Sequence, residues 1–202
     1  MHYAISHHAS QHDFLSSTPR RKLLKHTLLH VTEGLVLIKL GKLEYAVEAG
    51  DTFWLPFDTL CAITYFPNSK TQTVELSSRV QLTLPAKGGY VKLNELSRAL
   101  IHRLSDETRN FEMDNELLAV FKTEISGFSP KLKESPLTQQ INHWKWDGRD
   151  SVLSTELQLV LKMREASKMM LSGKKRPQVV ELLFEGNDQT FTQLEALLLG
   201  RS

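Results

Sequence analysis

The sequence predicts an α+β protein, with an antiparallel β-barrel followed by a helical hairpin and an all-helical C-terminal region. Three observations support this fold class. Short apolar runs separated by turn residues recur about every ten residues between 22 and 84, a spacing typical of antiparallel barrels and sandwiches. After Pro85 the apolar period changes from two to about 3.6. A segment containing Pro, Ser and Lys at 128–135 then indicates a linker.

Composition limits the classes of protein that the chain can belong to. With 202 residues it can bury a core without disulfides, and its single cysteine, Cys61, predicts a reducing, cytoplasmic compartment. The net charge of +2 is close to balance, so composition alone does not indicate a nucleic-acid binder. No apolar segment approaches the length that spans a bilayer, and no signal peptide is evident, so we expect no membrane partner.

Residues 1–19 lack apolar periodicity and carry four histidines among Ser and Gln: His2, His7, His8 and His12. This composition predicts a mobile tail, since nothing in the segment sets a coordination geometry for a metal. The barrel is predicted to follow, over 20–88. The alternation in Leu43–Glu48 indicates a strand with one apolar face.

Strand alternation also predicts which side chains face the barrel interior. Counting alternate residues from Cys61 places Cys61, Ile63 and Tyr65 inward. Thr27, Leu29 and Val31 face them from the opposite strand, and the rings of Tyr45 and Trp54 are expected near the mouth of the barrel. The predicted pocket comprises Thr27, Leu29, Val31, Tyr45, Trp54, Cys61, Ile63 and Tyr65. Such a lining suits a small apolar or mildly polar ligand. The alternative, equally open from the residues, is that these side chains simply fill the barrel.

Residues 89–128 are predicted to form a helical hairpin. Its first helix carries one apolar stripe, which we interpret as a dimerisation surface: Leu93, Leu96, Leu100, Ile101 and Leu104. Asp114 is the predicted N-cap of the second helix, which ends at Gly127. The remaining segment, 129–202, is predicted to be helical after the linker, with Ser154 as the N-cap of a long helix and Thr190 as the N-cap of the last one.

Two short motifs lie within the predicted barrel. Val31-Thr32-Glu33-Gly34 precedes Gly50-Asp51-Thr52-Phe53-Trp54-Leu55-Pro56, with 16 positions from Gly34 to Gly50 and six from Gly50 to Pro56. Their order and separation resemble the two motifs of the cupin family over roughly 27–76. The resemblance implies a small β-barrel that holds a ligand, a metal or a partner subunit.

The positions of metal ligands in cupins can be compared with this chain. The family's glutamate position holds Thr27, its last histidine position holds Cys61, and 20–23 contain no histidine. A lone thiol without imidazole or carboxylate partners does not make a zinc, iron or manganese site. His30 lies in the same segment but points opposite to Thr27 by strand alternation. We therefore expect no metal, no cofactor, no catalytic residues and no enzymatic activity.

The order of barrel, hairpin, linker and helical region resembles the AraC type of transcription regulator. That resemblance implies effector binding or dimerisation by the first half and DNA binding by paired helix-turn-helix units in the second. The last segment looks like the first helix and turn of such a unit, with key positions Thr190, Leu194, Gly200, Arg201 and Ser202. On this alignment the recognition helix begins at or beyond Ser202, and DNA is a partner only if the chain continues.

Other interpretations stay open. A second alignment takes Met163-Arg164-Glu165-Ala166 as the helix between two such units. A third takes 129–202 as a helical bundle without a DNA role. At the level of function, the leading hypothesis is a homodimeric AraC-like regulator. The alternatives are a metal-independent cupin enzyme of the isomerase or epimerase type and a stand-alone dimeric partner-binding protein.

Overall fold

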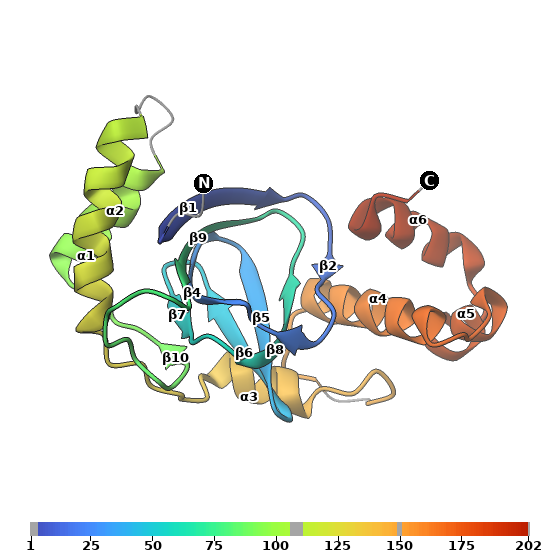
Figure 1. Cartoon of the computed structure of the whole chain (residues 1–202). Coiled ribbons are helices and arrows are strands. Elements are labelled where there is room, and N and C mark those ends of the chain that lie inside the picture. Colours follow the sequence, from blue (N-terminus) through green and yellow to red (C-terminus); the bar gives the residue numbers. More distant parts are fainter. Residues whose placement is uncertain (1–3, 106–110, 149–150, 202) are drawn as a thin grey trace.

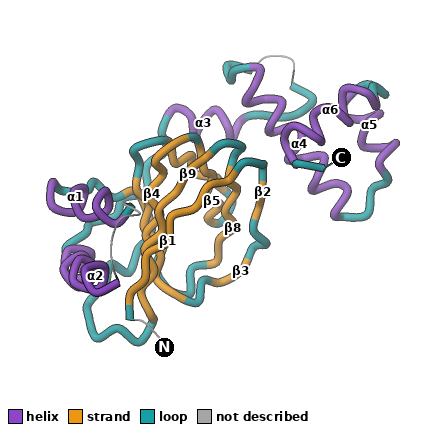
Figure 2. Tube along the Cα trace, turned by 90° about the horizontal axis from the view of Figure 1, so that it is seen from above, coloured by secondary structure: helices purple, strands orange, loops and turns teal. Residues whose placement is uncertain are grey.

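The computed structural model describes residues 4–105, 111–148 and 151–201, and within them it is an α+β protein. Two antiparallel sheets form the first part, and the helices follow them. Figure 1 shows the α1–α2 hairpin on one side of the sheets and α4–α6 on the other, with α3 beneath. The view from above in Figure 2 gives the same order. The predicted fold class is confirmed.

One sheet has the strand order β1-β9-β4-β7-β10, and the other β2-β8-β5-β6, with β3 also paired to β8. The strands are β1 (Ile5–His12), β2 (Ser16–Ser17), β3 (Arg21–Lys22), β4 (Lys25–Glu33), β5 (Leu35–Leu40), β6 (Leu43–Glu48), β7 (Thr52–Leu55), β8 (Leu60–Tyr65), β9 (Ser69–Ser77) and β10 (Gly89–Tyr90). The sheets enclose one apolar core without closing into a continuous barrel. Gly41, at φ +62, forms the tight turn between β5 and β6.

The expectation of a mobile tail at 1–19 is wrong for β1. All eight residues of β1 pair with β9, from Ile5 opposite Leu76 to His12 opposite Ser69. The His12 ring also stacks on Tyr65, with 3.8 Å between centroids. Backbone pairing needs no apolar alternation, so a polar strand at a sheet edge leaves no periodic pattern to read. His2 lies outside the described residues.

A second core lies between the outer face of the first sheet and the hairpin of α1 (Glu95–Leu104) and α2 (Phe111–Ser126). Leu28 and Trp54 come from the sheet, and Phe121 and Ile125 from α2. Asn94 caps α1 by accepting a hydrogen bond from the Ser97 N–H at 2.7 Å. Helix α2 begins at Phe111, so Asp114, the expected cap, lies inside the helix.

Helix α3 (Pro136–His143) covers the edge strand β6. The Ala46 N–H donates to Thr138 Oγ1 and the Glu44 N–H to Asn142 Oδ1, both at 2.9 Å. Asn142 Nδ2 returns a bond to the Glu44 carbonyl at 2.8 Å. These side chains satisfy backbone groups that an open sheet edge would leave exposed to other strands.

Helices α4 (Thr155–Leu171), α5 (Arg176–Phe184) and α6 (Asp188–Leu199) form a three-helix unit with its own core, containing Met163, Val180 and Phe191. Ser154 caps α4, as the sequence predicts. Asn187, not Thr190, caps α6, because its side chain reaches the Thr190 N–H at 2.9 Å.

An apolar cluster and two further contacts join this three-helix unit to the sheets. In the cluster, Leu161 of α4 is buried together with Leu37 of β5 and Ala46 of β6. Arg164 of α4 and Glu44 of β6 form an ion pair at 2.8 Å, with side chains only 8% and 16% exposed. On the other side, Leu15 of the β1–β2 loop is buried in the core of the unit, and its N–H donates to the Leu198 carbonyl at 2.7 Å. None of the helices in the described part of the chain combines the length and apolar composition needed to cross a membrane.

Candidate functional site

The predicted pocket is brought together in large part but is packed with side chains. Leu29, Val31, Tyr45, Cys61 and Ile63 share the core between the sheets, with Tyr65 against it. Thr27 lies on the same face of β4 and is buried. Trp54 is the exception: the register places it on the opposite face of β7, where it contacts the hairpin and donates to the Pro85 carbonyl at 2.9 Å.

Trp54 was expected near the mouth because the strand offset of β7 is not visible in the sequence. In the structure its neighbours Phe53 and Leu55 point inward instead. Phe53, Tyr45 and Tyr90 meet there, with 4.9 Å between the ring centroids of Phe53 and Tyr90 and 6.0 Å between those of Tyr45 and Phe53. These rings occupy space that the pocket hypothesis leaves for a ligand.

Tyr90 is an interior residue that the sequence analysis missed. It lies on the two-residue strand β10, too short to leave an alternating pattern. Its hydroxyl donates to the Ala46 carbonyl at 2.6 Å, which links the two sheets. Burial is the largest cause that raises the pKa of Tyr90 to about 12, so the phenol keeps its proton and acts as a structural donor.

Cys61 is buried, and burial raises the pKa of its thiol while nearby Arg21 opposes the shift. A protonated thiol in apolar surroundings is a poor nucleophile and a poor metal ligand. Cys61 therefore contributes to packing.

His26, His30 and Glu33 lie close together in the sequence and could suggest a metal site, but their side chains contact separate partners. His26 Nδ1 accepts from the Phe57 N–H at 3.0 Å, and its ring stacks on Trp54. His30 Nδ1 bonds Thr52 Oγ1 at 2.9 Å, and Glu33 pairs with Lys70 at 3.0 Å. Across 4–105, 111–148 and 151–201, no three His, Cys, Asp or Glu side chains gather where they could hold a metal ion.

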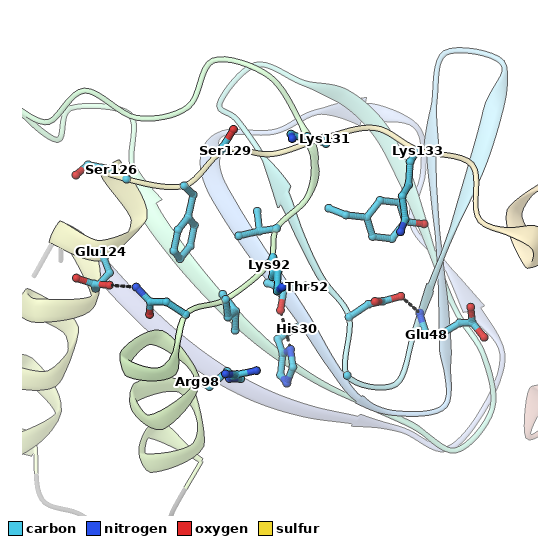
Figure 3. Close-up of a pocket in the computed structure, with 18 of the residues that line it drawn as sticks. His30, Glu48, Thr52, Lys92, Arg98, Glu124, Ser126, Ser129, Lys131 and Lys133 are labelled. Atoms are coloured by element: carbon cyan, nitrogen blue, oxygen red, sulfur yellow. Dashed lines mark hydrogen bonds between the residues drawn. The ribbon is translucent and has the colours of Figure 1, made fainter.

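A groove of about 1170 Å³, lined by both polar and apolar side chains, lies outside the sheets, where three parts of the chain meet. The sheet contributes His30 and Thr52, the hairpin contributes Arg98, and the linker after α2 contributes Lys131 and Lys133. Figure 3 shows the linker crossing above His30 and Thr52, with Arg98 below them. The sequence analysis did not find this groove, because its residues are spread over 105 positions of the chain, from His30 to Ser135.

The predicted dimerisation stripe is largely unavailable to a second copy. Leu93, Leu100, Ile101 and Leu104 are buried in the core beneath the hairpin. Leu96 alone among the five is exposed, at 48%. An apolar helical stripe is equally suited to the chain's own sheet and to a partner, and the sheet occupies it here.

Helices α5 and α6 are joined across residues 185–187, where Glu185 and Gly186 adopt positive φ angles of 53° and 77°. Both alignments of the motif have this element order. In the first alignment α6 is the opening helix of a helix-turn-helix, and in the second Met163–Ala166 belong to the preceding helix, here α4, with α5 and α6 after it. That the recognition helix begins at or beyond Ser202 therefore stays a prediction of the first alignment.

The residues predicted for DNA binding occupy different environments. Thr190 is exposed in the first turn of α6, and Leu194 packs against the core of the unit. Gly200 caps the helix at φ +63, against the Phe14 ring, and Arg201 is exposed. Ser202 lies outside the described residues.

The exposed residues of α6 are uncharged over much of its length: Gln189, Thr192 and Gln193 are polar, and Ala196 and the 68% exposed Leu197 are apolar. Arg176 at the start of α5 bonds Asp188 at 3.1 Å, Thr192 at 2.7 Å and Glu195 at 2.5 Å. Its guanidinium also lies over the Phe191 ring, 4.6 Å from the centroid. Arg176 therefore ties the start of α5 to α6 and sets how the two helices meet.

No family model matches the sequence, and no curated protein matches it. Among solved structures, the ethanolamine utilization protein EutQ from Salmonella typhimurium is 16% identical, with a TM-score of 0.32 over 38% of this chain and 61% of that one. An RmlC-like cupin from Shewanella frigidimarina is 14% identical, with a TM-score of 0.34 over 39% of this chain and 71% of that one.

A third likeness extends over nearly the whole chain. ToxT from Vibrio cholerae, a regulator of the AraC family, is 8% identical, with a TM-score of 0.42 over 97% of this chain and 95% of that one. This chain thus spans less than two thirds of the EutQ chain and nearly all of ToxT. Identities this low with TM-scores below 0.5 do not establish a family, so the function is argued from the chain's own residues.

Proposed function

We propose that the chain is an AraC-like transcription regulator, whose cupin-like sheets respond to an effector or a second copy and whose α4–α6 unit binds DNA. The observation that carries this proposal is the α5–turn–α6 arrangement, set in a unit with its own core and docked on the sheets. On the second alignment of the sequence, α6 serves as the recognition helix of this motif.

The exposed face of α6 supplies the chemistry for reading bases. Gln189 and Gln193 carry amide groups that can donate and accept, the pattern that recognises adenine in the major groove. Lys174 and Lys175, exposed just before α5, are placed for phosphate contacts at one end of the motif.

The charge of the unit predicts how it binds. Residues 151–201 hold seven Lys and Arg against six Asp and Glu. Non-specific affinity comes from phosphate neutralisation, so a nearly neutral unit binds random DNA weakly and shows a shallow salt dependence. Discrimination between sequences then depends on the polar face of α6.

The test is selection of bound sequences from random duplex DNA by the full chain at low and moderate salt. We expect enrichment of a motif, and about tenfold weaker binding to it for Gln193→Ala. Gln139→Ala is the matched control, because Gln139 is an exposed glutamine on α3, far from α6 in the sequence. No enriched sequence, or equal losses in the two variants, would reject DNA reading by α6.

We also propose that the sheets have no catalytic role. General acid–base chemistry in a barrel needs facing groups that exchange a proton. Tyr45, Cys61 and Tyr65 lie in or against the core between the sheets, and no His, Asp or Glu side chain is buried in the described part of the chain. The isomerase or epimerase alternative is therefore disfavoured.

A second candidate function is partner binding through the hairpin. It is favoured by two apolar side chains that stay exposed on α1 and α2, Leu96 at 48% and Val120 at 47%. This function does not need DNA, so a chain that dimerises but enriches no sequence in the selection would favour it.

A further inference from the structure

The groove outside the sheets is lined by the sheets, the hairpin and the linker that leads toward the α4–α6 unit, and by no described residue of that unit itself. Its floor includes His30 and Thr52 of the first sheet, and its walls include Arg98 of α1 and residues 126–135 that lead to α3 (Figure 3). A molecule bound there would contact the sheets, the hairpin and the linker simultaneously. The packed space between the sheets offers no such contact with the linker.

The backbone around the groove is well fixed. Lys131 and Tyr90 exchange two backbone hydrogen bonds of 2.9 Å, so the linker pairs with the end of the first sheet. Gly89, at φ +151, lets the two backbones touch, since a Cβ there would lie 2.5 Å from the Lys131 carbonyl carbon. The side chains of the linker therefore project from a positioned backbone.

The charges of the lining are unevenly paired. Lys92, Arg98, Lys131 and Lys133 line the groove, and none has an ion pair or hydrogen bond from its side chain to another residue in the described part of the chain. Two of the three carboxylates of the lining, in contrast, have hydrogen-bond donors within the protein. Glu124 accepts from the Asn94 side chain at 2.7 Å and from the Ser97 hydroxyl at 3.4 Å.

Of the other two carboxylates in the lining, Asp51 accepts from the Glu48 N–H at 3.1 Å. Two of the three acidic groups are thus held by the protein's own donors, while four cations stay available. A cleft lined by unpaired cations concentrates anions, because the low-dielectric walls focus the field. Hydroxyls of Thr123, Ser126, Ser129 and Ser135 add further donors.

Building on the proposed regulatory function, we propose that this groove is the effector site and that the effector is a small multivalent anion bearing carboxylate or phosphate groups. Lys131 and Lys133 bind it from the linker, and Lys92 and Arg98 from the hairpin side. Because the anion bridges linker and hairpin, its binding favours the arrangement in which the linker stays paired with Tyr90.

The test is calorimetric titration of the full chain at constant ionic strength with three probes: citrate, inorganic pyrophosphate and neutral sorbitol. We expect citrate or pyrophosphate to bind with a stoichiometry of one, and sorbitol to give no heat. A preference between the two anions tells whether carboxylate or phosphate is the recognised group. In a parallel NMR titration with the same anion, the His30 imidazole signals should shift, because the ring forms part of the groove floor.

Variants make the test specific. Arg98→Met and Lys131→Met should each weaken binding of the better anion at least tenfold. Lys42→Met is the control, because it removes an exposed lysine from the β5–β6 turn, outside the groove. All variants should keep the wild-type thermal midpoint, which separates loss of binding from loss of folding.

Two results would overturn the proposal: no binding of either anion, or an equal loss in all three variants, as general charge screening would produce. DNA selection is measured separately on the same protein. Failure of anion binding with an enriched DNA motif removes only this effector site. Anion binding without an enriched motif removes the DNA-reading function and leaves the groove as a binding site.

Discussion

Individual histidines have distinct roles that follow from their partners. His7 bonds Gln72 at 3.1 Å, His12 stacks on Tyr65, and His26 accepts from the backbone of Phe57. His30 is held by Thr52 in the groove floor. Burial lowers the pKa values of His12, His26 and His30, which favours the neutral form of these three rings.

These lowered pKa values predict a pH dependence of stability. The unfolded chain binds protons at these rings near the ordinary pKa of about 6.5, whereas the folded chain binds them only at lower pH. The unfolded state therefore binds more protons, and the free energy of unfolding decreases as pH falls below about 6.5. We expect urea midpoints to decrease between pH 7 and pH 5.

His30→Asn should make that decrease smaller, because the change removes a half-buried titrating ring and keeps a polar group near Thr52. His8→Asn is the control, since His8 is an exposed histidine on the edge strand β1. An identical slope for wild type and His30→Asn would contradict this account.

At the scale of elements, residues that belong to one predicted apolar stripe on α1 differ in their exposure to solvent. Leu100 of α1 is 6% exposed, while Leu96, one turn earlier, is 48% exposed. We expect Leu100→Glu to unfold the hairpin, because a buried charge without a partner costs several kcal/mol, whereas a charge at an exposed position changes stability by about 0.5 kcal/mol or less.

Leu96→Glu is accordingly the informative variant for self-association. If the exposed face of the hairpin joins two copies, sedimentation should show a dimer for wild type and a monomer for Leu96→Glu, with equal thermal midpoints. Leu171→Glu on α4 is the matched control, because Leu171 is also an exposed leucine near a helix end. A dimer that persists in Leu96→Glu would place the interface elsewhere.

At the scale of the whole molecule, the β1–β2 loop connects the sheets to the helix that we propose reads DNA. Leu15 enters the core of the α4–α6 unit, and Phe14 lies against Gly200 at the end of α6. Together with the Arg164–Glu44 pair, this loop fixes the unit on the sheets from a second direction.

We expect Leu15→Ala to destabilise that docking by about 2–4 kcal/mol, the range for truncation of a buried leucine. The measurement is hydrogen exchange by mass spectrometry, in which α6 and the β1–β2 loop should exchange faster while β4 and β7 are unchanged. Leu24→Ala serves as control because Leu24 is 82% exposed. Unchanged exchange in α6 would show that the Arg164–Glu44 pair and the apolar cluster around Leu161 hold the unit without the loop.

Much of the local structure was accessible from the pattern of residues. Strands between Lys25 and Ser77, the period change after Pro85 and the Ser154 cap depend on alternation and capping within a few positions. The inward set Leu29, Val31, Cys61 and Ile63 was also accessible, because alternation fixes the face of each residue within a strand.

Other features depend on contacts between distant segments, and no local pattern reports them. Strand β1 pairs through its backbone, and Trp54 takes its face from the register of β7 against β4. The N-cap of α6 was placed at Thr190 instead of Asn187, because both are residue types that cap helices and only the folded backbone decides between them. The groove was missed because its cations come from separate elements.

The sequence alone was sufficient for the fold class, most strands and helices, and the polar or apolar character of each face, because these depend on neighbours within one or two turns of the chain. Only the tertiary structure decided what these residues contact. It packs the apolar stripe of α1 on the sheet, buries Leu15 in the helical unit and brings four cations together in one groove: Lys92, Arg98, Lys131 and Lys133. Burial and charge pairing are properties of residues that meet in space, and chain order does not specify which residues meet.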